Sequence, residues 1–406
     1  MDSKRYEKKL LRYTYIFCLI CFFNLSTLYW PKETIDKTAI IMGVMICGLI
    51  AYAHFIIRKF FPDGDKYIQI FASILTVVGI VMLYRLNKGE ALKQVIWFTV
   101  GIIGFILIVV LLPDLKRFSK YRYFYLICTI ALMALGTLLG QEKHGSKNWI
   151  TLGGYAFQPS EFGKILLVAY LSAALKKYEN YKDLIEPAII VMVSLGFMVL
   201  QKDLGSALIF FGISVTMLYI ATSKIKYVAT CFALFAVGSA VSYKLFSHLR
   251  IRVAIWKDVW SYATAEGYQV VQSMIAIASG GLFGTGLGQG HPEFVPVNST
   301  DFIFSSLCEE MGGLMGFAVI ILYFLLFYRC MRAAVHAEDK FSALLAVGYS
   351  SMIATQVLVI VGGVINLIPL TGITLPLISY GGSSMITTFF ALGILQKISE
   401  EGTGIE

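Results

Sequence analysis

The chain has few charged residues. Asp, Glu, Lys and Arg make up 15% of its 406 residues, whereas soluble globular domains carry about a quarter. Hydrophobic residues account for 57%, and apolar stretches of roughly 20 residues, long enough to cross a bilayer, recur from one end to the other. This shortage of charge excludes a soluble protein with a single buried core. It predicts an all-α integral membrane protein.

The chain also lacks the patterns of a disulfide-rich or metal-binding protein. Its 7 cysteines are odd in number and lie within or at the edge of apolar runs, as is typical of small apolar packing residues. The 5 histidines form no ligand pair on one helix. No small-residue cleavage site follows the first apolar run, so we expect that run to remain as a membrane span. No internal repeat is visible, and inverted repeats would have favoured a transporter.

Positive charge is present, at a net +9, but it is divided among short clusters between the apolar runs. The positive-inside rule predicts this arrangement, so we expect no nucleic acid as a partner. The clusters occur in every second loop, which places these loops and both termini in the cytoplasm. They are Lys4/Arg5/Lys8/Lys9, Arg58/Lys59, Lys116/Arg117/Lys120/Arg122, Lys176/Lys177, Lys224/Lys226 and Arg329/Arg332/Lys340.

About twelve helices are predicted to span the membrane, on the requirement of roughly 20 apolar residues each. The range 162–175 is short and is accepted because polar turns bound it. The predicted spans are residues 11–30, 38–57, 67–84, 94–112, 122–140, 162–175, 184–200, 204–222, 227–246, 303–327, 341–365 and 378–398.

Two connections on the side opposite the basic clusters are long, residues 141–161 and 247–300. Connections longer than about 15 residues are usually functional. Within the second, Tyr268–Gly281 is amphipathic and predicts a helix at the membrane interface; a solvated connector is the alternative. Alternate glycines between residues 284 and 290 indicate close approach of the backbone.

The first long connection ends in a polar cluster at the start of a predicted helix. Ser160 follows a proline and suits the capping position, and Glu161 and Lys164 share one helix face. Either this is a capped helix start with a surface ion pair, or it is a polar anchor facing an outer cavity.

Acidic residues mark the end of the second long connection. Asp301 is followed directly by Phe302-Ile303-Phe304, and Glu309 and Glu310 lie inside the same apolar run. Carboxylates at membrane depth cost a few kcal/mol on insertion scales, so they are candidates for function; an ordinary N-cap is the alternative for Asp301. A third motif, Pro369–Ser384, breaks helices and is rich in hydroxyls, and it either packs as a re-entrant turn or lines a cavity.

Taken in order, these motifs resemble those of the SEDS family (shape, elongation, division and sporulation), the family of RodA and FtsW. The resemblance covers Phe71 to Lys397 and implies a ten-helix core at residues 67–398. Residues 1–66 then form an N-terminal addition with two helices, and residues 399–406 a cytoplasmic tail. The landmarks are Trp149-Ile150, Gln158-Pro159-Ser160-Glu161 with Lys164, Gln201-Lys202-Asp203-Leu204-Gly205, Arg252 with Trp256 and Asp258, Gly267-Tyr268-Gln269 with Gln272-Ser273, Thr300-Asp301-Phe302-Ile303-Phe304 with Glu309-Glu310-Met311-Gly312, and Leu375–Ser384.

Four positions depart from the usual residues of the family, namely Asn148, Val297, Ile360 and Asn366. The pattern over residues 362–369 favours the elongation type, so the chain resembles RodA more than the division type. Roles in elongation, division and sporulation stay open.

The resemblance implies a peptidoglycan glycosyltransferase that polymerises lipid II into glycan strands at the outer face of the bacterial cytoplasmic membrane. A flippase for the lipid-linked precursor is the alternative, and a scaffold without chemistry is the third class. A flippase needs polar groups throughout its bundle, whereas a polymerase needs them at the outer mouth. The enzyme is favoured because the polar candidates map to outward loops or helix ends: Glu161, Lys164, Asp203, Arg252, Glu293 and Asp301.

The resemblance also implies roles for single residues. Asp301 matches the essential Asp of the family and is expected to be the general base. No cofactor is indicated, although a pyrophosphate leaving group can recruit Mg²⁺ or another divalent cation. The expected partners are lipid II, the nascent glycan chain, membrane lipids and a class B penicillin-binding protein. The expected substrate-binding residues are Glu293, Lys164, Glu161, Gln158, Ser160, Arg252, Gln269 and Gln272.

Overall fold

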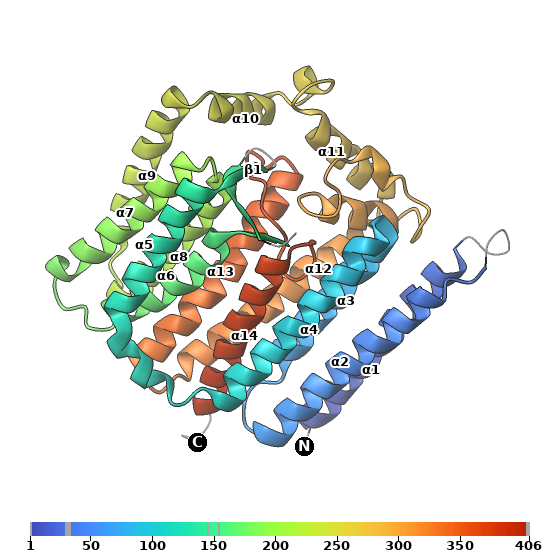
Figure 1. Ribbon diagram of the computed structural model, residues 1–406, viewed down its shortest axis with the longest axis horizontal. Helices are drawn as coiled ribbons and strands as arrows, with labels where there is room; N and C mark the ends of the chain where they lie inside the picture. The colour runs from blue at the N-terminus through green and yellow to red at the C-terminus, as the bar shows by residue number, and fades with distance from the viewer. Residues whose placement is uncertain (1, 29–33, 144–145, 153–154, 403–406) are drawn as a thin grey trace.

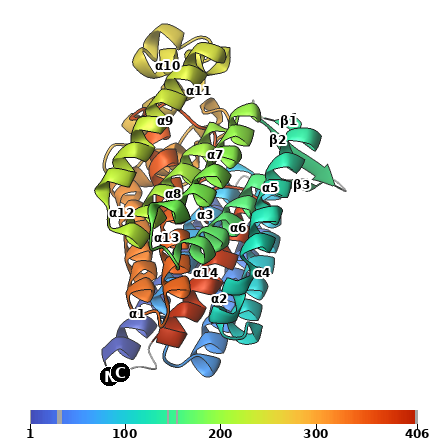
Figure 2. The same ribbon diagram turned by 90° about the vertical axis from the view of Figure 1, so that its left-hand side faces the viewer.

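The structure, a computed structural model, describes residues 2–28, 34–143, 146–152 and 155–402. Its long helices lie side by side in one bundle (Figure 1). Helix α1 begins and helix α14 ends at the same end of this bundle, and α10, α11 and the three strands lie at the opposite end (Figure 2). We call the latter the loop-rich end.

The first half of the chain contains α1 (Asp2–Thr27), α2 (Lys37–Phe60), α3 (Tyr67–Leu86), α4 (Lys88–Leu111), η1 (Leu115–Tyr121), α5 (Arg122–Leu139), β1 (Gln141–Lys143), β2 (Ser146–Leu152), β3 (Tyr155–Phe157), α6 (Pro159–Leu175), η2 (Tyr181–Leu184) and α7 (Ile185–Leu200). The second half contains α8 (Leu204–Thr222), α9 (Ile225–Leu245), α10 (Ser247–Lys257), η3 (Trp260–Tyr262), α11 (Tyr268–Gly280), η4 (Pro292–Phe294), α12 (Ile303–Val335), α13 (Lys340–Val364) and α14 (Gly382–Gly402).

Every predicted span overlaps one of these helices, and residues 29–30, at the end of the first predicted span, lie outside the described residues. By length and composition, 10 helices in the described part of the chain could cross a membrane, so the class of membrane protein is confirmed but the number twelve is not. Two of the predicted spans lie outside this set: α6, with 17 residues, and α14, whose first turns carry several hydroxyl side chains.

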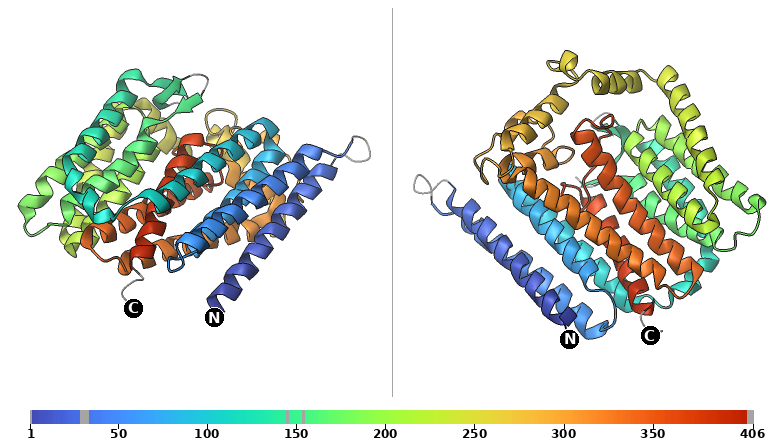
Figure 3. Two further views of the ribbon diagram at one scale, coloured as in Figure 1. Left: turned by 60° about the horizontal axis from the view of Figure 1, so that its bottom comes forward. Right: turned by 180° about the vertical axis from the view of Figure 1, so that it is seen from behind.

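The centre of the bundle is formed by α3 and α13, which are buried at most of their positions. Helix α3 packs against α12, α4 and α1, and α13 packs against α8, α12 and α6. Helices α1 and α2 pack together as a hairpin at one side and contact α3 and α4 (Figure 3). Helix α9 has no buried residue and packs against α8 and α10, so it is among the least enclosed helices.

The first long connection contains a small sheet, which the all-α prediction did not include. Strands β1, β2 and β3 form an antiparallel sheet in that order, with Trp149 opposite Gln141 and Thr151 opposite Ala156. Residues 144–145 and 153–154 lie outside the described residues. The second long connection contains α10 and α11, and the predicted helix at 268–281 is confirmed as α11.

The last span begins four residues later than the predicted residue 378, because the chain makes a turn there. The hydroxyl of Ser379 accepts a hydrogen bond from the amide of Leu375 at 2.9 Å, and Leu377 has a φ of 69°. A Cβ on Gly79 of α3 would lie 2.6 Å from the Cα of Ile378. Glycine at position 79 therefore allows this turn to lie directly against α3. Helix α14 also runs on to Gly402, past the predicted end at 398.

Candidate active site

Asp203 is the centre of a buried polar network at the loop-rich end. It is the N-cap residue of α8 and accepts a hydrogen bond from the amide of Ser206 at 3.0 Å. Its Oδ2 atom accepts from four further side chains: Asn148, Gln158 at 3.2 Å, Ser160 at 3.5 Å and Ser206 at 2.7 Å. One carboxylate thus ties β2, the start of α6 and the start of α8 together.

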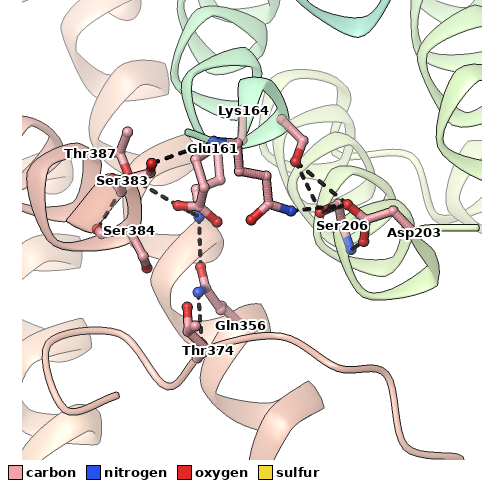
Figure 4. Close-up of polar contacts among 11 residues, drawn as sticks. Glu161, Lys164, Asp203, Ser206, Gln356, Thr374, Ser383, Ser384 and Thr387 are labelled. Atoms are coloured by element: carbon pink, nitrogen blue, oxygen red, sulfur yellow. Dashed lines mark hydrogen bonds and ion pairs between the residues drawn. The ribbon is translucent and has the colours of Figure 1, made fainter. Parts of the chain in front are cut away.

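Glu161 and Lys164 form a buried ion pair beside this network (Figure 4). Lys164 Nζ lies 2.8 Å from Glu161 Oε2 and donates to Gln356 Oε1 of α13 at 2.8 Å. The hydroxyl of Thr387 in α14 donates to Glu161 at 3.0 Å. The alternative of a surface ion pair is wrong, because the Lys164 side chain is only 2% exposed.

The predicted capping role of Ser160 is also wrong. Helix α6 begins at Pro159, its N-cap residue is Gln158, and no side chain caps it. Ser160 therefore lies inside the first turn, where its hydroxyl reaches Asp203. Proline has no amide hydrogen and suits the first position of a helix, which explains why α6 begins at Pro159, two residues earlier than a Ser160 cap would place it.

Asp301 lies beside the helix-breaking segment that precedes α14. A Cβ on Gly372 would lie 3.5 Å from Asp301 Oδ2, and one on Gly205 would lie 3.3 Å from Thr371. Residues 371–372 therefore lie between Asp301 and the start of α8. The N-cap alternative for Asp301 is wrong, because Phe302 holds that position of α12.

Arg252 of α10 interacts electrostatically with both Asp203 and Asp301. Its guanidinium donates to the carbonyl oxygens of Leu370 at 3.2 Å and Thr371 at 3.3 Å. Burial lowers the pKa of Arg252, while the negative charges of Asp203 and Asp301 raise it. Because an arginine stays protonated in proteins, Arg252 presents a fixed positive charge that both carboxylates attract.

Two buried hydroxyls near this site have no hydrogen-bond partner among the described residues, Thr371 Oγ1 and Ser384 Oγ. Buried polar atoms are normally paired with protein or water. Both hydroxyls are therefore available to a polar ligand or to water.

The remaining substrate-binding candidates lie outside the buried network. Gln269 and Gln272 are partly exposed on α11, and neither side chain makes a hydrogen bond with a described residue. Glu293 in η4 is exposed and lies 3.0 Å from His291 Nδ1. A hydrogen bond from its own backbone amide, and then one from His291, lower the pKa of Glu293.

A large apolar cavity reaches the same site. It has a volume of about 900 Å³ and lies between α7, α8 and α9. Most of its lining is aliphatic or aromatic, but Arg252, Leu370 and Thr371 also line it. The cavity thus connects an apolar space between membrane helices with the positive charge beside Asp301.

Comparison with known proteins gives the family. The model of the FtsW, RodA and SpoVE family, described as cell cycle proteins, matches residues 65–404. This chain belongs to that family. It is 37% identical over 386 residues to the peptidoglycan glycosyltransferase RodA of Mycobacterium tuberculosis H37Rv, covering 88% of this chain and 82% of that protein. It is 31% identical over 356 residues to stage V sporulation protein E of Bacillus subtilis 168, covering 82% and 96%.

Solved structures agree with this placement. A chain from a peptidoglycan synthase complex that coordinates polymerization and crosslinking superposes with a TM-score of 0.73 at 27% identity, covering 83% of this chain and 97% of that chain. The rod shape determining protein RodA of Thermus thermophilus superposes with a TM-score of 0.64 at 26% identity, covering 84% and 97%. This RodA-like protein is therefore an integral membrane protein of the family.

The paired glutamates of this RodA-like protein hold in place the segment at the loop-rich end that leads to Glu293. Glu310 forms a 2.9 Å ion pair with Arg85 of α3 and accepts from the amide of Gly288 at 2.9 Å. Glu309 accepts from the amide of His291 at 2.9 Å. Their carboxylates therefore hold the segment 288–291 against α12 rather than facing lipid.

A break in α12 makes room for this segment. Gly312 has a φ of 87° inside the helix, and the carbonyls of Glu309 and Glu310 accept from the amides of Thr285 and Gly286, both at 2.9 Å. A Cβ on Gly284 would lie 2.3 Å from the Glu310 carbonyl oxygen. The close approach that the alternate glycines predicted is confirmed at Gly284.

From the sequence, Asp203 is predicted as one of the outward acidic residues but not as a site residue, and Gln356 is not predicted at all. Both carry a recognisable signal, because each is a polar residue at an end of, or inside, an apolar run. Binding of Mg²⁺ or another divalent cation stays a prediction. The described residues contain no group of three or more His, Cys, Asp or Glu side chains able to hold a metal ion.

Proposed function

We propose that this protein is a peptidoglycan glycosyltransferase that polymerises lipid II, with Asp301 as its general base. The observation that carries this proposal is the apolar cavity of about 900 Å³ whose lining also includes Arg252 and Thr371. A lipid-linked sugar diphosphate has a long apolar tail and a doubly charged head. The apolar lining suits the tail, and Arg252 suits the diphosphate.

In the proposed reaction, the 4-hydroxyl of the acceptor sugar attacks the anomeric carbon of the donor. Asp301 takes the proton of that hydroxyl as the new glycosidic bond forms. The bond from the anomeric carbon to the lipid pyrophosphate breaks, and the pyrophosphate leaves with the bonding electron pair. Arg252 balances its charge, so no separate general acid is required.

The names of the relatives support an enzyme over a flippase. The direct test is purified protein in lipid vesicles with labelled lipid II, scored for glycan polymer on a gel. Polymer formation supports the proposal. Movement of lipid II across the vesicle membrane without polymer would favour the flippase.

Filling the apolar cavity should weaken substrate binding. A Cβ at Gly238 of α9, which lines the cavity, meets no atom within 4 Å, so Gly238→Leu should fold normally. We expect the KM for lipid II to rise about tenfold, the equivalent of losing roughly two methylene contacts at ~0.8 kcal/mol each. Steady-state polymerisation kinetics measure this change.

Gly104→Leu is the matched control. Gly104 of α4 also has open space at its Cβ position, and it does not line the cavity. Its KM should stay within about twofold of the wild-type value. Equal KM values for both variants would show that the tail does not occupy this cavity.

We propose that both termini are cytoplasmic and that the loop-rich end faces outward. The alternation of basic loops supports this, together with the position of α1 and α14 ends opposite α10 and α11. Thr264→Cys, in an exposed turn after η3, should react with an impermeant thiol reagent in intact cells. Lys177→Cys, exposed after α6, should react only after lysis, and the reverse pattern would invert the topology.

We also propose a class B penicillin-binding protein as partner. The support is the similarity to a chain of a synthase complex that coordinates polymerization and crosslinking. Co-purification with the transpeptidases of the same cell tests this partner, and failure with all of them would count against it.

A further inference from the structure

Gln94 lies near the start of α4, and its buried side-chain amide forms hydrogen bonds with the main chain of the turn at residues 379–381. Its side chain is 1% exposed. Nε2 donates to the carbonyl oxygen of Ser379 at 3.0 Å, and Oε1 accepts from the amide of Gly381 at 3.2 Å. Both ends of one side chain thus hold residues 379–381.

Residues 379–381 also form hydrogen bonds with the residues just before Asp301. The hydroxyl of Ser379 donates to the carbonyl oxygen of Thr300 at 2.6 Å. The amide of Tyr380 donates to the carbonyl oxygen of Ser299 at 2.9 Å. Two hydrogen bonds therefore fix the main chain immediately ahead of the carboxylate.

Asp301 needs such an anchor because it precedes its helix. Helix α12 begins at Ile303, so the hydrogen bonds of the helix do not fix the main chain at residue 301. Val297, at the start of the preceding turn, has a φ of 55°, a conformation that a β-branched residue adopts only under strain. Strained backbone persists where surrounding contacts hold it.

We propose that Gln94 is a positioning residue for Asp301, acting through residues 379–381 and 299–300. This inference rests on the proposed function. Losing the Gln94 amide leaves the buried carbonyl of Ser379 and the partly buried amide of Gly381 without this partner, and the turn must move to find other partners. A shift of about 1 Å in a catalytic group can cost about 10²-fold in rate.

The experiment is Gln94→Met, which keeps the length of the side chain and removes both hydrogen bonds. Polymerisation of labelled lipid II in vesicles should show kcat lowered about 10- to 100-fold. The KM should stay within about threefold, because Gln94 touches neither the cavity nor Arg252. Rates are expressed per folded protein, measured as the monodisperse fraction on size exclusion.

Gln69→Met is the matched control. Gln69 is a buried glutamine near the first turn of α3 whose amide donates to Ser73 at 3.0 Å, at the end of the bundle opposite Asp301. Its kcat should stay within about twofold of wild type. An equal loss in both variants, or an unchanged kcat in Gln94→Met, would overturn the proposal.

A double-mutant cycle with Ser379→Ala tests whether Gln94 acts on Asp301 through residues 379–381. Both changes loosen the same pairing, so the double variant should lose less than the product of the single losses. If the loss in kcat of the double variant equals the product of the single losses, the two residues do not act together, and the proposal is overturned. If Gln94→Met does not fold, the kcat of Ser379→Ala decides alone, and a wild-type value refutes the proposal.

The same assay separates this inference from the proposed function. Wild-type protein that makes no polymer contradicts the function itself. Active wild type, inactive Asp301→Asn and fully active Gln94→Met contradict only the role of Gln94.

Discussion

Replacing Asp301 by Asn should give a protein that inserts into the membrane but makes almost no polymer from lipid II. The substitution keeps the shape of the side chain and removes its ability to accept a proton. A positioned general base contributes about 10²–10⁴-fold to a rate, so kcat should fall by that factor. Gel analysis of labelled polymer from purified protein measures it.

Asp258→Asn provides the matched control for this prediction. Asp258 is an exposed carboxylate in the second long connection, which precedes Asp301, and it accepts a hydrogen bond from Ser261 at 2.5 Å. Its polymerisation rate should stay near the wild-type rate. Polymer made by Asp301→Asn at a rate close to wild type would refute the assignment of the base.

Replacing Lys164 by Met should lower the free energy of unfolding by about 3–5 kcal/mol, because it leaves the buried charge of Glu161 without its partner. Both side chains of this pair are nearly buried, at 2% and 9% exposed. The melting temperature of the purified protein in detergent should therefore fall clearly. Fluorescence-based thermal unfolding measures the change.

The double variant Glu161→Gln/Lys164→Met separates structure from substrate binding. It removes both charges and should regain most of the lost stability. If it is as unstable as the single variant, the ion pair is not the cause. A stable double variant without polymerisation would support the predicted substrate contact of Lys164, and a stable, active one would leave Lys164 with a structural role.

The positions of the helices could be predicted from the sequence because the bilayer sets their length. Residues 67–84 and 204–222 were predicted as spans and are helical as α3 and α8. The start of α14 could not be predicted in the same way. Residues 378–381 are apolar or small, and their turn depends on hydrogen bonds from Gln94 and to Ser299 and Thr300.

The candidate site was predicted in part. Arg252 interacts electrostatically with both Asp203 and Asp301, so part of the predicted polar set lies together, and the role of Asp301 as the base stays a prediction. The burial of the Glu161–Lys164 pair was not foreseen, because the sequence shows their shared helix face but not the helices α13 and α14 that cover it.

The sequence by itself determined that this is an α-helical membrane protein, where most of its long helices lie and, through its motifs, the family to which it belongs. These follow from local properties, since each span needs about 20 apolar residues whatever it contacts. The tertiary structure decided which polar side chains meet. Gln94 and Ser379 are 285 positions apart, and Asn148 and Asp203 are 55 apart. Hydrogen bonds between such distant residues depend on how the helices pack, and no local pattern in the chain records that packing.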